Sequence, residues 1–469
     1  MQTKLSGSQK NEKELLKWRR RNSYYYSFLD KLFASNIRPG SRVLHIGCQS
    51  GDLLASVQPS YGVGIDPDGA LIELAKKRFT HLNFFTADPH QCELDEKFDY
   101  IIVCNSLGSW HDIQEVFERA IKCAHEDTRI VITYYNYLWE SVLRLGSMLN
   151  IRRPGAYQNW LPPEDIENLL MLSGWDMIRT SSYMMTPKYI PLISAFFNCI
   201  LSIMPILCHL NLINLVIARP VPKPKADEDY SVTVLVPCRN ERGNIEDAIK
   251  RIPDMGRETE IIFVDGNSTD GTAEEIEKQI ATYPNRKIKL IHQGDGVGKG
   301  DAVRKGFSAA SGDVLVIQDA DLTAPPEDLP KFFNALRDGK GEYINGSRLV
   351  YPMEKQAMRF LNLLGNKFFG MLFTWLLGQR FRDTLCGTKM LTKKHYDLIA
   401  ENRAYFGDFD PFGDFDLIFG SVKQNFKVAQ VPVTYRARTY GSTNISRFRH
   451  GLLLLKMSWV AFKKIKWIS

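Results

Sequence analysis

Three short apolar runs in the second half of the chain each lead into acidic side chains, and this repeat most constrains the fold. The runs cover residues 232–236, 260–264 and 314–317, and they are followed by Glu241, Asp265 and the Asp319-Ala320-Asp321 triplet, respectively. A helix-like stretch separates the first two runs, which is typical of a parallel, doubly wound sheet. Such sheets bind ligands outside the carboxyl ends of their strands. We therefore expect the acidic side chains to converge on one edge of an α/β sheet.

The Asp319-Ala320-Asp321 triplet is a candidate metal site. Two carboxylates one residue apart at a strand end can bind one hard divalent cation and leave room for phosphate oxygens. Nearby, residues 294–300 form a glycine-rich turn that lets the backbone approach a ligand closely, and Lys299 within it is a cation for phosphate. The turn does not have the spacing of a Walker loop. The alternative for the triplet is a solvated turn after a core strand.

Seven strings in this half occur in the order found in one enzyme family. They are VPCRNE, VDGNSTDGT, GKGDAVRKGF, DADLTAPPEDL, NGSR, RDTLCGTKML and VPVTYRARTYGSTN. This half resembles the GT-A family 2 glycosyltransferases, and within them the polyprenyl-phosphate sugar synthases such as dolichyl-phosphate mannose and glucose synthases. The chain lacks the Gln-x-x-Arg-Trp string and the pore helices of processive polysaccharide synthases. The resemblance therefore implies transfer of a single sugar.

The resemblance also assigns binding roles to residues. The implied nucleotide-sugar ligands are Pro237, Glu241, Asp265, Lys299, Asp319, Ala320, Asp321 and Arg438. Asp319, Asp321 and Thr323 would hold Mg or Mn on the diphosphate, where a divalent cation neutralises charge that develops on the leaving group. Arg348 and Arg359 would bind the acceptor, because a guanidinium is a permanent two-pronged donor to phosphate. An alternative for each arginine is a solvated surface position.

Two kinds of acceptor remain open. The oxygen of a lipid monophosphate is already anionic near neutral pH, so it needs positioning rather than a strong base. A sugar hydroxyl must instead lose its proton to a carboxylate, for which Asp414 and Asp416 are the candidates. Both acids have an alternative role in capping a helix or strand near the site. The predicted catalytic residues are Asp319, Asp321, Arg348, Asp414 and Asp416.

The first half of the chain repeats the strand-and-turn pattern with a different turn. Residues 42–46 lead into a glycine turn at residues 47–51, and the next apolar run ends at Asp66. An acid about 15 to 20 residues after a glycine turn suits the two hydroxyls of a cofactor ribose. A NAD-binding domain shares this signal.

Later strings favour another cofactor. Together with NFFTAD and FDYIIVCNSLGSWHDIQEVFERAIKCAHEDTRIVIT, the first half resembles the class I S-adenosylmethionine-dependent methyltransferases. The cofactor-binding residues implied by the resemblance are Gly47, Gly51, Asp66, Asp88 and Asn105. His45 stands where the family usually has an acid, and Gln49 where it has a third glycine. A non-catalytic cofactor-binding or assembly module is the alternative to a working methyltransferase.

The 469 residues suffice for two domains with full cores. We expect a methyltransferase-like domain over residues 1–218, a proline-rich linker over 219–230, a GT-A domain over 231–444 and a basic amphipathic tail helix over 445–469. The predicted class is α/β, with two doubly wound sheets in tandem, the N-terminal one Rossmann-like. Residues 189–217 are apolar, but prolines and asparagines interrupt them, so we expect a helix and the last strand of the first sheet.

The tail and the composition indicate where the protein works. Residues 445–469 carry six cations and no acid beside an apolar stripe, which is typical of a helix in a membrane interface; packing against its own domain is the alternative. The net charge of +7 favours an anionic bilayer as partner, and no nucleic-acid motif accompanies it. Eight scattered cysteines and a polar N-terminus without a secretory signal pattern favour the cytoplasm, at the inner face of the membrane. The oligomeric state is not indicated.

The expected function is therefore twofold. The C-terminal domain is predicted to move one sugar from a nucleotide sugar, with Mg or Mn, to a polyprenyl phosphate at the membrane surface. The N-terminal domain is predicted to methylate a related glycan or lipid with S-adenosylmethionine. The alternative is a glycosyltransferase with a soluble hydroxyl or glycan acceptor and a non-catalytic N-terminal module.

Overall fold

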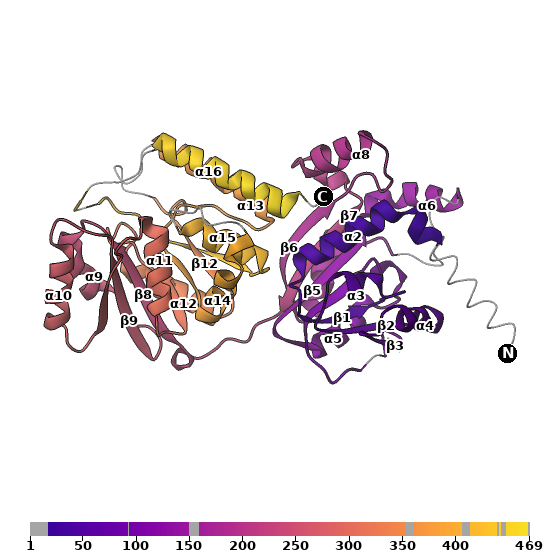
Figure 1. Ribbon diagram of the computed structural model, residues 1–469, viewed down its shortest axis with the longest axis horizontal. Coiled ribbons are helices and arrows are strands. Elements are labelled where there is room, and N and C mark those ends of the chain that lie inside the picture. Colours follow the sequence, from indigo (N-terminus) through magenta and orange to yellow (C-terminus); the bar gives the residue numbers. More distant parts are fainter. Residues whose placement is uncertain are drawn as a thin grey trace. The chain divides into compact units, whose positions relative to one another are not determined.

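The computed structural model describes residues 17–91, 93–149, 159–352, 360–405, 413–438, 440–441 and 447–467. The chain divides into two compact units, Met1–Val221 and Pro222–Ile465 (Figure 1). Each unit contains a seven-stranded sheet with helices packed on it. The prediction of two α/β sheets in tandem is confirmed.

The sheet of the N-terminal unit has the strand order β3-β2-β1-β4-β5-β7-β6. Its strands are β1 (Arg42–Ile46), β2 (Tyr61–Asp66), β3 (Asn83–Thr86), β4 (Phe98–Cys104), β5 (Ala124–Tyr135), β6 (Trp175–Tyr183) and β7 (Ile213–Pro220). The first five are parallel, whereas β7 runs antiparallel to β5 and β6. Successive residues of β1 alternate between two cores, with Val43 on one face and Leu44 on the other. Burial on both faces explains why the central strands are continuously apolar.

The helices of this unit are α2 (Ser23–Asn36), α3 (Asp52–Ser56), α4 (Gly69–Arg78), α5 (Ile113–Lys122), α6 (Glu140–Met148), α7 (Pro163–Leu172) and α8 (Ile193–Ala195). After α8 the chain continues as a π-helical segment, Phe196–Ile200, and as 3-10 helical segments, Leu201–Ile203 and Leu207–Leu210, before it enters β7. Pro205 lacks an amide hydrogen and interrupts this stretch. The predicted strand is present as β7, and the predicted helix is present as a short, irregular helical segment over residues 193–203.

The sheet of the C-terminal unit has the order β10-β9-β8-β11-β13-β12-β14. Its strands are β8 (Ser231–Cys238), β9 (Glu258–Asp265), β10 (Lys287–His292), β11 (Val314–Ile317), β12 (Tyr343–Ser347), β13 (Lys389–Thr392) and β14 (Val428–Pro432). Strand β13 runs antiparallel to β11 and β12, and the other neighbours are parallel. The helices are α9 (Ile245–Arg251), α10 (Thr272–Thr282), α11 (Gly298–Ala309), α12 (Leu329–Arg337), α13 (Phe360–Leu377), α14 (Lys393–Glu401), α15 (Asp414–Lys423) and α16 (Arg447–Ala461).

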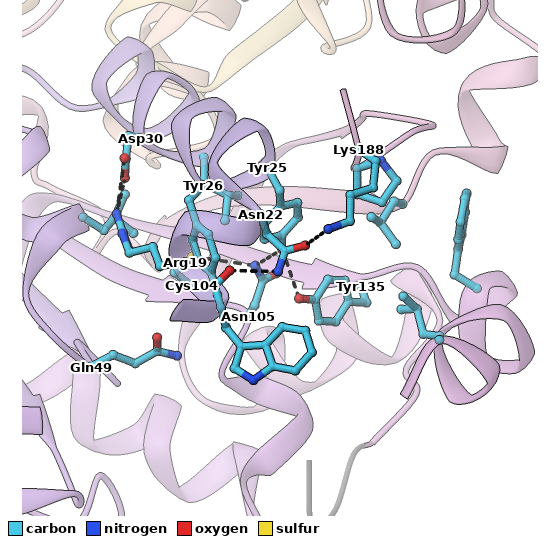
Figure 2. A pocket seen from close by; sticks show the side chains of 18 of the residues that line it. Arg19, Asn22, Tyr25, Tyr26, Asp30, Gln49, Cys104, Asn105, Tyr135 and Lys188 are labelled. Atoms are coloured by element: carbon cyan, nitrogen blue, oxygen red, sulfur yellow. Dashed lines mark hydrogen bonds and ion pairs between the residues drawn. The ribbon is translucent and has the colours of Figure 1, made fainter. Parts of the chain in front are cut away.

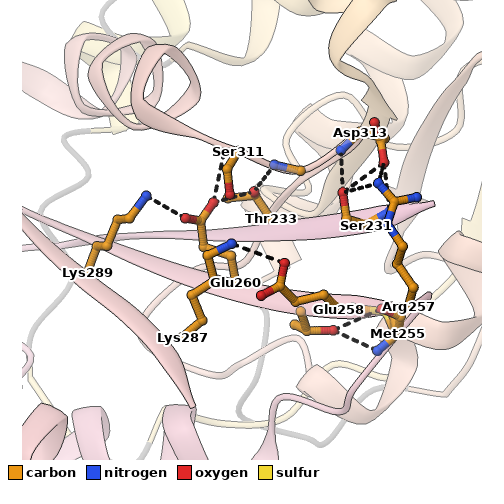
Figure 3. A network of polar contacts seen from close by, with 12 residues as sticks. Ser231, Thr233, Met255, Arg257, Glu258, Glu260, Lys287, Lys289, Ser311 and Asp313 are labelled. Atoms are coloured by element: carbon orange, nitrogen blue, oxygen red, sulfur yellow. Dashed lines mark hydrogen bonds and ion pairs between the residues drawn. The ribbon is translucent and has the colours of Figure 1, made fainter. Parts of the chain in front are cut away.

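A buried carboxylate connects the amino ends of these strands (Figure 3). Glu260 in β9 accepts hydrogen bonds from Thr233 in β8 at 2.7 Å and from the amide of Ser311 before β11 at 2.9 Å. It also pairs with Lys289 in β10 at 2.6 Å. Burial by itself would raise the pKa of Glu260, but Lys289 and the hydrogen bonds lower it to about 2. This network fixes the strands at the edge opposite to their acidic ends.

Helix α16 packs one face into the same core as α13 and leaves its opposite face exposed. Leu454, Met457 and Ala461 of α16 are buried in the same core as Phe373 of α13. The opposite face of α16 exposes Leu452, Leu455 and Trp459. The alternative that the tail packs on its own domain is thus correct for one face. None of the helices in the described ranges is both long and apolar enough to cross a membrane.

Candidate functional site

The acidic strand ends of the C-terminal unit come together at the carboxyl edge of neighbouring strands β9, β8 and β11. Arg438, which follows β14, donates hydrogen bonds to Glu241 Oε1 at 2.9 Å and to Asp321 Oδ2 at 2.6 Å. One guanidinium therefore spans the acid after β8 and the acid after β11. Asp265 ends β9, directly opposite Cys238 at the end of β8. The predicted convergence of these side chains is found.

Asp319 lies at the centre of this edge and is held by a lysine. Lys299, at the start of α11, contacts Asp319 Oδ1 at 2.6 Å. Burial alone would raise the pKa of Asp319, but the charge and hydrogen bond of Lys299 lower it below its usual value. A methyl group on Gly387 would lie 1.9 Å from Asp319 Oδ2, so only glycine leaves space for this carboxylate. About a third of the Asp319 side chain (32%) remains exposed.

Asp321 is oriented by its own turn. Its Oδ1 accepts hydrogen bonds from the amide of Thr323 at 3.1 Å and from the Thr323 hydroxyl at 2.9 Å. Leu322 between them adopts a positive φ of 51°, which closes the turn tightly. The carboxylate and hydroxyl oxygens of Asp319, Asp321 and Thr323 are hard donors, and they fit Mg²⁺ or Mn²⁺. Both carboxylates already pair with cationic side chains, which shows that the site favours positive charge.

Asp265 presents an unsatisfied oxygen. Asp265 is only 4% exposed, and Oδ1 has no hydrogen-bond partner among the described residues. Oδ2 accepts a hydrogen bond from the amide of Ser268 at 3.3 Å. A buried oxygen without a donor costs free energy, so this position suits a ligand that carries an N–H or O–H group. Pro237 and Ala320 contribute the backbone of the same edge.

Arg348 is paired with an acid that the sequence did not single out. Its Nε and Nη2 donate to the two oxygens of Asp383 at 2.8 and 2.9 Å, and its amide also donates to Asp383 at 3.0 Å. Asn366 adds a further donor to Asp383 at 3.0 Å. Arg348 lowers the pKa of Asp383 to about 2 against the opposing effect of burial. Arg359, the other predicted acceptor ligand, lies outside the described residues.

The two candidate base residues point to different surroundings. Asp414 pairs with Lys389, Nζ to Oδ1, at 3.2 Å. Asp416 pairs with Arg403, Nε to Oδ2, at 2.6 Å. Side chains two residues apart on a helix face different directions, so α15 separates them. Asp414 also helps Asp319 to raise the pKa of Lys299, against the opposing effect of burial.

Lys389 and Asp383 are functional candidates that sequence reasoning missed. Both occur in the string RDTLCGTKML, and Lys389 is completely buried at the start of β13. Its ammonium donates to the carbonyl of Cys386, and it helps to lower the pKa of Asp319. A lysine within an apolar strand is the signal that could have revealed it, because a buried cation needs a buried partner.

The glycine turn of the N-terminal unit has the predicted shape. Gly47 and Gly51 have φ angles of 77° and 78°, and a methyl group on either would lie within 2.7 Å of Ser106 or Phe84. Gln49 adopts the same left-handed region, with a φ of 49°, although it is not glycine. The turn therefore keeps the geometry expected of a third glycine at Gln49.

Two of the predicted cofactor-binding residues, Asp66 and Asp88, already form hydrogen bonds within the protein. Asp66 is buried and accepts hydrogen bonds from the amides of Gln49 at 2.9 Å and Asp68 at 3.0 Å. Burial raises the pKa of Asp66. Asp88 is about half exposed and accepts from the amide and the ring Nδ1 of His90 at 3.0 and 2.8 Å. Neither Asp66 nor Asp88 lines the cavity described next.

A cavity of about 490 Å³ lies beside the glycine turn (Figure 2). Gly47, Gln49 and Asn105 line it, together with aromatic residues of α2 and apolar residues of α6. Asn105 donates to the hydroxyl of Tyr25 at 2.7 Å, and the hydroxyls of Tyr25 and Tyr135 lie 3.1 Å apart. Gly47 and Asn105 thus line one cavity, and Gly51 lies outside it.

His45 contributes a buried neutral ring to the wall of this cavity. Neither ring nitrogen has a hydrogen-bond partner within the described part of the chain. Burial lowers the pKa of His45 to about 3. The orphaned nitrogens, the tight glycine turn and the unpaired Oδ1 of Asn105 are polar features that fit a cofactor with donor and acceptor groups.

Comparison with known proteins agrees with this division. The family model "Glycosyl transferase family 2" matches residues 233–397, and the model "Methyltransferase domain" matches residues 17–180. A glycosyltransferase AglJ of Haloferax volcanii is 31% identical over 49% of this chain and 70% of that protein. The chain thus combines a methyltransferase domain with a glycosyltransferase domain, and it belongs to glycosyltransferase family 2.

Other relatives and solved structures each match one half of the chain. A dolichol-phosphate mannosyltransferase of Pyrococcus furiosus is 32% identical over 46% of this chain, which spans 59% of that protein's length. A solved glucosyl-3-phosphoglycerate synthase of Mycobacterium tuberculosis is 19% identical, with a TM-score of 0.36, over 50% of this chain and 80% of its own. A solved SAM-dependent methyltransferase of Thermotoga maritima is 12% identical, with a TM-score of 0.35. The match covers 44% of this chain and 94% of that protein.

Proposed function

We propose that the C-terminal unit transfers one sugar from a nucleotide sugar to a polyprenyl phosphate at a membrane surface and requires Mg or Mn. The observation that carries this proposal is the bridge from Arg438 to Glu241 and Asp321, beside the Lys299–Asp319 pair. Acids for a metal and cations for a diphosphate are thereby held together at one sheet edge. The dolichol-phosphate mannosyltransferase named above supports the choice of acceptor.

The donor would be held by residues with separate tasks. Asp265 has an oxygen ready to accept a hydrogen bond from a base or ribose. Asp319, Asp321 and Thr323 would hold the divalent cation, which neutralises charge on the departing nucleoside diphosphate. Lys299 and Arg438 would exchange carboxylate partners for phosphate oxygens. Their charge then stabilises the leaving group in a site where water is partly excluded.

The ion pairs of the two candidate bases favour a phosphate acceptor. Asp414 is bound to Lys389 and Asp416 to Arg403, so each carboxylate is neutralised by a neighbour. A hydroxyl acceptor needs a carboxylate that takes its proton, whereas a phosphate monoester is already anionic. Arg348, fixed on two sides by Asp383, is a rigid cation for such a phosphate.

The exposed face of α13 and α16 supports a membrane location. Leu364, Phe368 and Met371 of α13 are exposed, as are Leu452, Leu455 and Trp459 of α16. Lys456 and Lys463 are exposed on or after the same helix. Apolar side chains flanked by cations are suited to the interface of an anionic bilayer, here the inner face of the cytoplasmic membrane.

The N-terminal unit would methylate a glycan or lipid related to the product of the C-terminal unit. Gly47 and Asn105 would contact S-adenosylmethionine in the cavity, and the cofactor would supply an electrophilic methyl group. The polar atoms of Asn105, Tyr25 and Tyr135 would orient the acceptor. A non-catalytic cofactor-binding module is the second candidate, because the chain has His45 where related enzymes carry an acid.

Radiolabelled nucleotide sugars tested with membranes would decide the acceptor. We expect label to be extracted into organic solvent in the presence of Mg²⁺ or Mn²⁺, and to be lost in Asp321→Asn. The exposed helix variant Asp247→Asn is the matched control and should retain transfer. Label that stays in the aqueous phase would instead support a soluble hydroxyl acceptor.

Calorimetry with S-adenosylmethionine tests the N-terminal unit separately. We expect binding by the full-length chain, and unchanged binding in Asp321→Asn. No measurable binding would contradict a working methyltransferase.

A further inference from the structure

A large apolar surface covers one part of the N-terminal unit. We call residues 137–149 and 189–210 the apolar platform. Met148, Leu192 and Ile206 are 82%, 87% and 83% exposed, and Leu145, Phe196 and Ile200 are each about half exposed. Exposed apolar surfaces of this extent mark binding sites for membranes or other molecules. The proposed sugar transfer does not use this surface.

The start of the first segment of the apolar platform is hydrogen-bonded to the end of the second. The indole nitrogen of Trp139 donates to the carbonyl of Leu210 at 2.8 Å, and Asn136 donates to the carbonyl of His209 at 2.8 Å. Figure 1 shows α6 and α8, which belong to the two segments, at the top of the N-terminal unit. These hydrogen bonds bring the two segments together at residues 136–139 and 209–210.

Cations border the apolar platform. No Asp, Glu, Lys or Arg occurs from Tyr189 to Leu210, whereas residues 17–29 carry four cations and no acid, and one of the four, Arg19, pairs with Asp30 at 3.4 Å. Lys188 connects the two regions, because its ammonium donates to Asn22 Oδ1 at 2.6 Å. The rings of Tyr24 and Tyr189 also pack together, with centroids 5.7 Å apart. An apolar surface with a cationic border is complementary to an anionic bilayer.

The cavity beside the glycine turn opens onto this platform. Val142, Leu145 and Leu149 of the α6 segment line the cavity and are also more than half exposed, at 54%, 55% and 60%. The same cavity reaches Gly47 and Asn105. An amphiphile can therefore place its apolar chain along α6 and its polar group near Asn105 and Tyr25.

We propose that the N-terminal unit docks on an anionic bilayer through the apolar platform and takes a lipid-borne methyl acceptor from it. The second half of this statement rests on the proposed methyltransferase function. An acceptor hydroxyl or amine gives up one proton to solvent as its oxygen or nitrogen bonds the methyl carbon, and S-adenosylhomocysteine leaves. The platform supplies docking, and the cavity supplies the route from the bilayer to the glycine turn.

Vesicle flotation with the full chain tests the docking. The starting protein carries Leu452→Glu and Leu455→Glu, which remove the contribution of α16. In that background, Met148→Glu, Leu192→Glu and Ile206→Glu together should lower partition onto phosphatidylglycerol-containing vesicles about tenfold or more, since three apolar side chains leave the bilayer. None of these three residues lines the cavity, and all are exposed, so the fold is preserved. Met171→Glu, an exposed residue of α7 outside the platform, is the matched control.

Several results would overturn the docking proposal. The docking proposal fails if the platform variant and its parent protein partition equally onto phosphatidylglycerol-containing vesicles. Equal binding to neutral and anionic vesicles would remove the role of the cationic border. Loss of a dimer in sedimentation velocity, with unchanged vesicle binding, would assign the platform to a second copy of the chain.

A second measurement tests the lipid-borne acceptor. Methyl-labelled S-adenosylmethionine and membrane lipid extract should yield label in the organic phase, and the platform variant should yield about tenfold less from intact vesicles. Label confined to the aqueous phase would overturn this part. If calorimetry shows no cofactor binding, the methyltransferase function fails, while vesicle flotation still decides the docking.

Discussion

The guanidinium of Arg438 donates to Asp321 Oδ2 at 2.6 Å, although 117 residues separate them along the chain. The same guanidinium donates to Glu241. Arg438, a predicted nucleotide-sugar ligand, thus contacts both the predicted nucleotide-sugar ligand Glu241 and the predicted metal ligand Asp321. Because a cation at Asp321 and the side chain of Arg438 compete for one carboxylate, binding of donor and metal should be coupled.

Replacement of Arg438 by glutamine should weaken donor binding. A charged hydrogen bond to phosphate is worth about 1.5 to 3 kcal/mol, so we expect KM for the nucleotide sugar to rise about tenfold or more. The metal concentration for half-maximal activity should fall, because Asp321 loses a competing cation. Steady-state kinetics at several Mn²⁺ concentrations checks both. An unchanged KM would contradict the role of Arg438 in donor binding.

The space beside Gly387 should be essential for the position of Asp319. In Gly387→Ala the new methyl group would meet Asp319 Oδ2 at 1.9 Å, so the carboxylate must move. We expect sugar transfer to fall at least about a hundredfold, because an ångström-scale displacement of a catalytic group has that effect. Gly365→Ala in α13, where the structure shows no atom within 4 Å, is the control and should retain activity. Full activity of Gly387→Ala would place Asp319 outside the reaction.

Glu260 should make the C-terminal unit sensitive to acid. Its folded pKa of about 2 lies below the ordinary value of 4.5, so the folded state favours the charged form. The stabilisation is fully present above pH 4.5 and is lost as the pH falls toward 2. Over this interval the free energy of unfolding falls by about 3 kcal/mol. Denaturant unfolding at pH 6 and pH 3 should show a smaller pH dependence for Glu260→Gln than for the parent chain; equal dependence would contradict the folded-state pKa.

His45 should make the N-terminal unit sensitive to acid in a higher pH range. Its folded pKa of about 3 lies below the ordinary value of 6.5, so the unfolded state binds the proton more readily. Stability is therefore complete above pH 6.5 and falls as the pH is lowered toward 3. Between pH 6.5 and pH 5 the free energy of unfolding falls by about 2 kcal/mol. Unfolding of His45→Leu, followed by tryptophan fluorescence, should be nearly independent of pH in this interval.

Much of the fold and part of the site follow from local sequence. Runs such as residues 232–236 and 314–317 predict buried parallel strands, because a sheet covered on both faces needs continuous apolar side chains. The acids after them predict a site, because parallel strands present their carboxyl ends to one edge. The glycine turn at Gly47 and Gly51 is equally local, since positive φ angles and close packing exclude a side chain there.

Other features depended on the arrangement of distant segments. Asp414 and Asp416 look equivalent in sequence, but α15 directs one to Lys389 and the other to Arg403. Asp66 was predicted as a ribose ligand, and the structure shows both of its oxygens accepting backbone amides. The sequence predicts a helix and a strand over residues 189–217, but only the folded unit shows that many apolar side chains of residues 189–210 are exposed.

The sequence by itself determined the two α/β units, the acidic strand ends and the glycine turn, because strand periodicity and turn conformation depend on neighbouring residues. The tertiary structure alone decided which acid pairs with which cation, how the cavity reaches α6, and where the apolar platform lies. Ion pairs and burial depend on residues that are far apart in the chain. Their partners appear only when helices and strands pack.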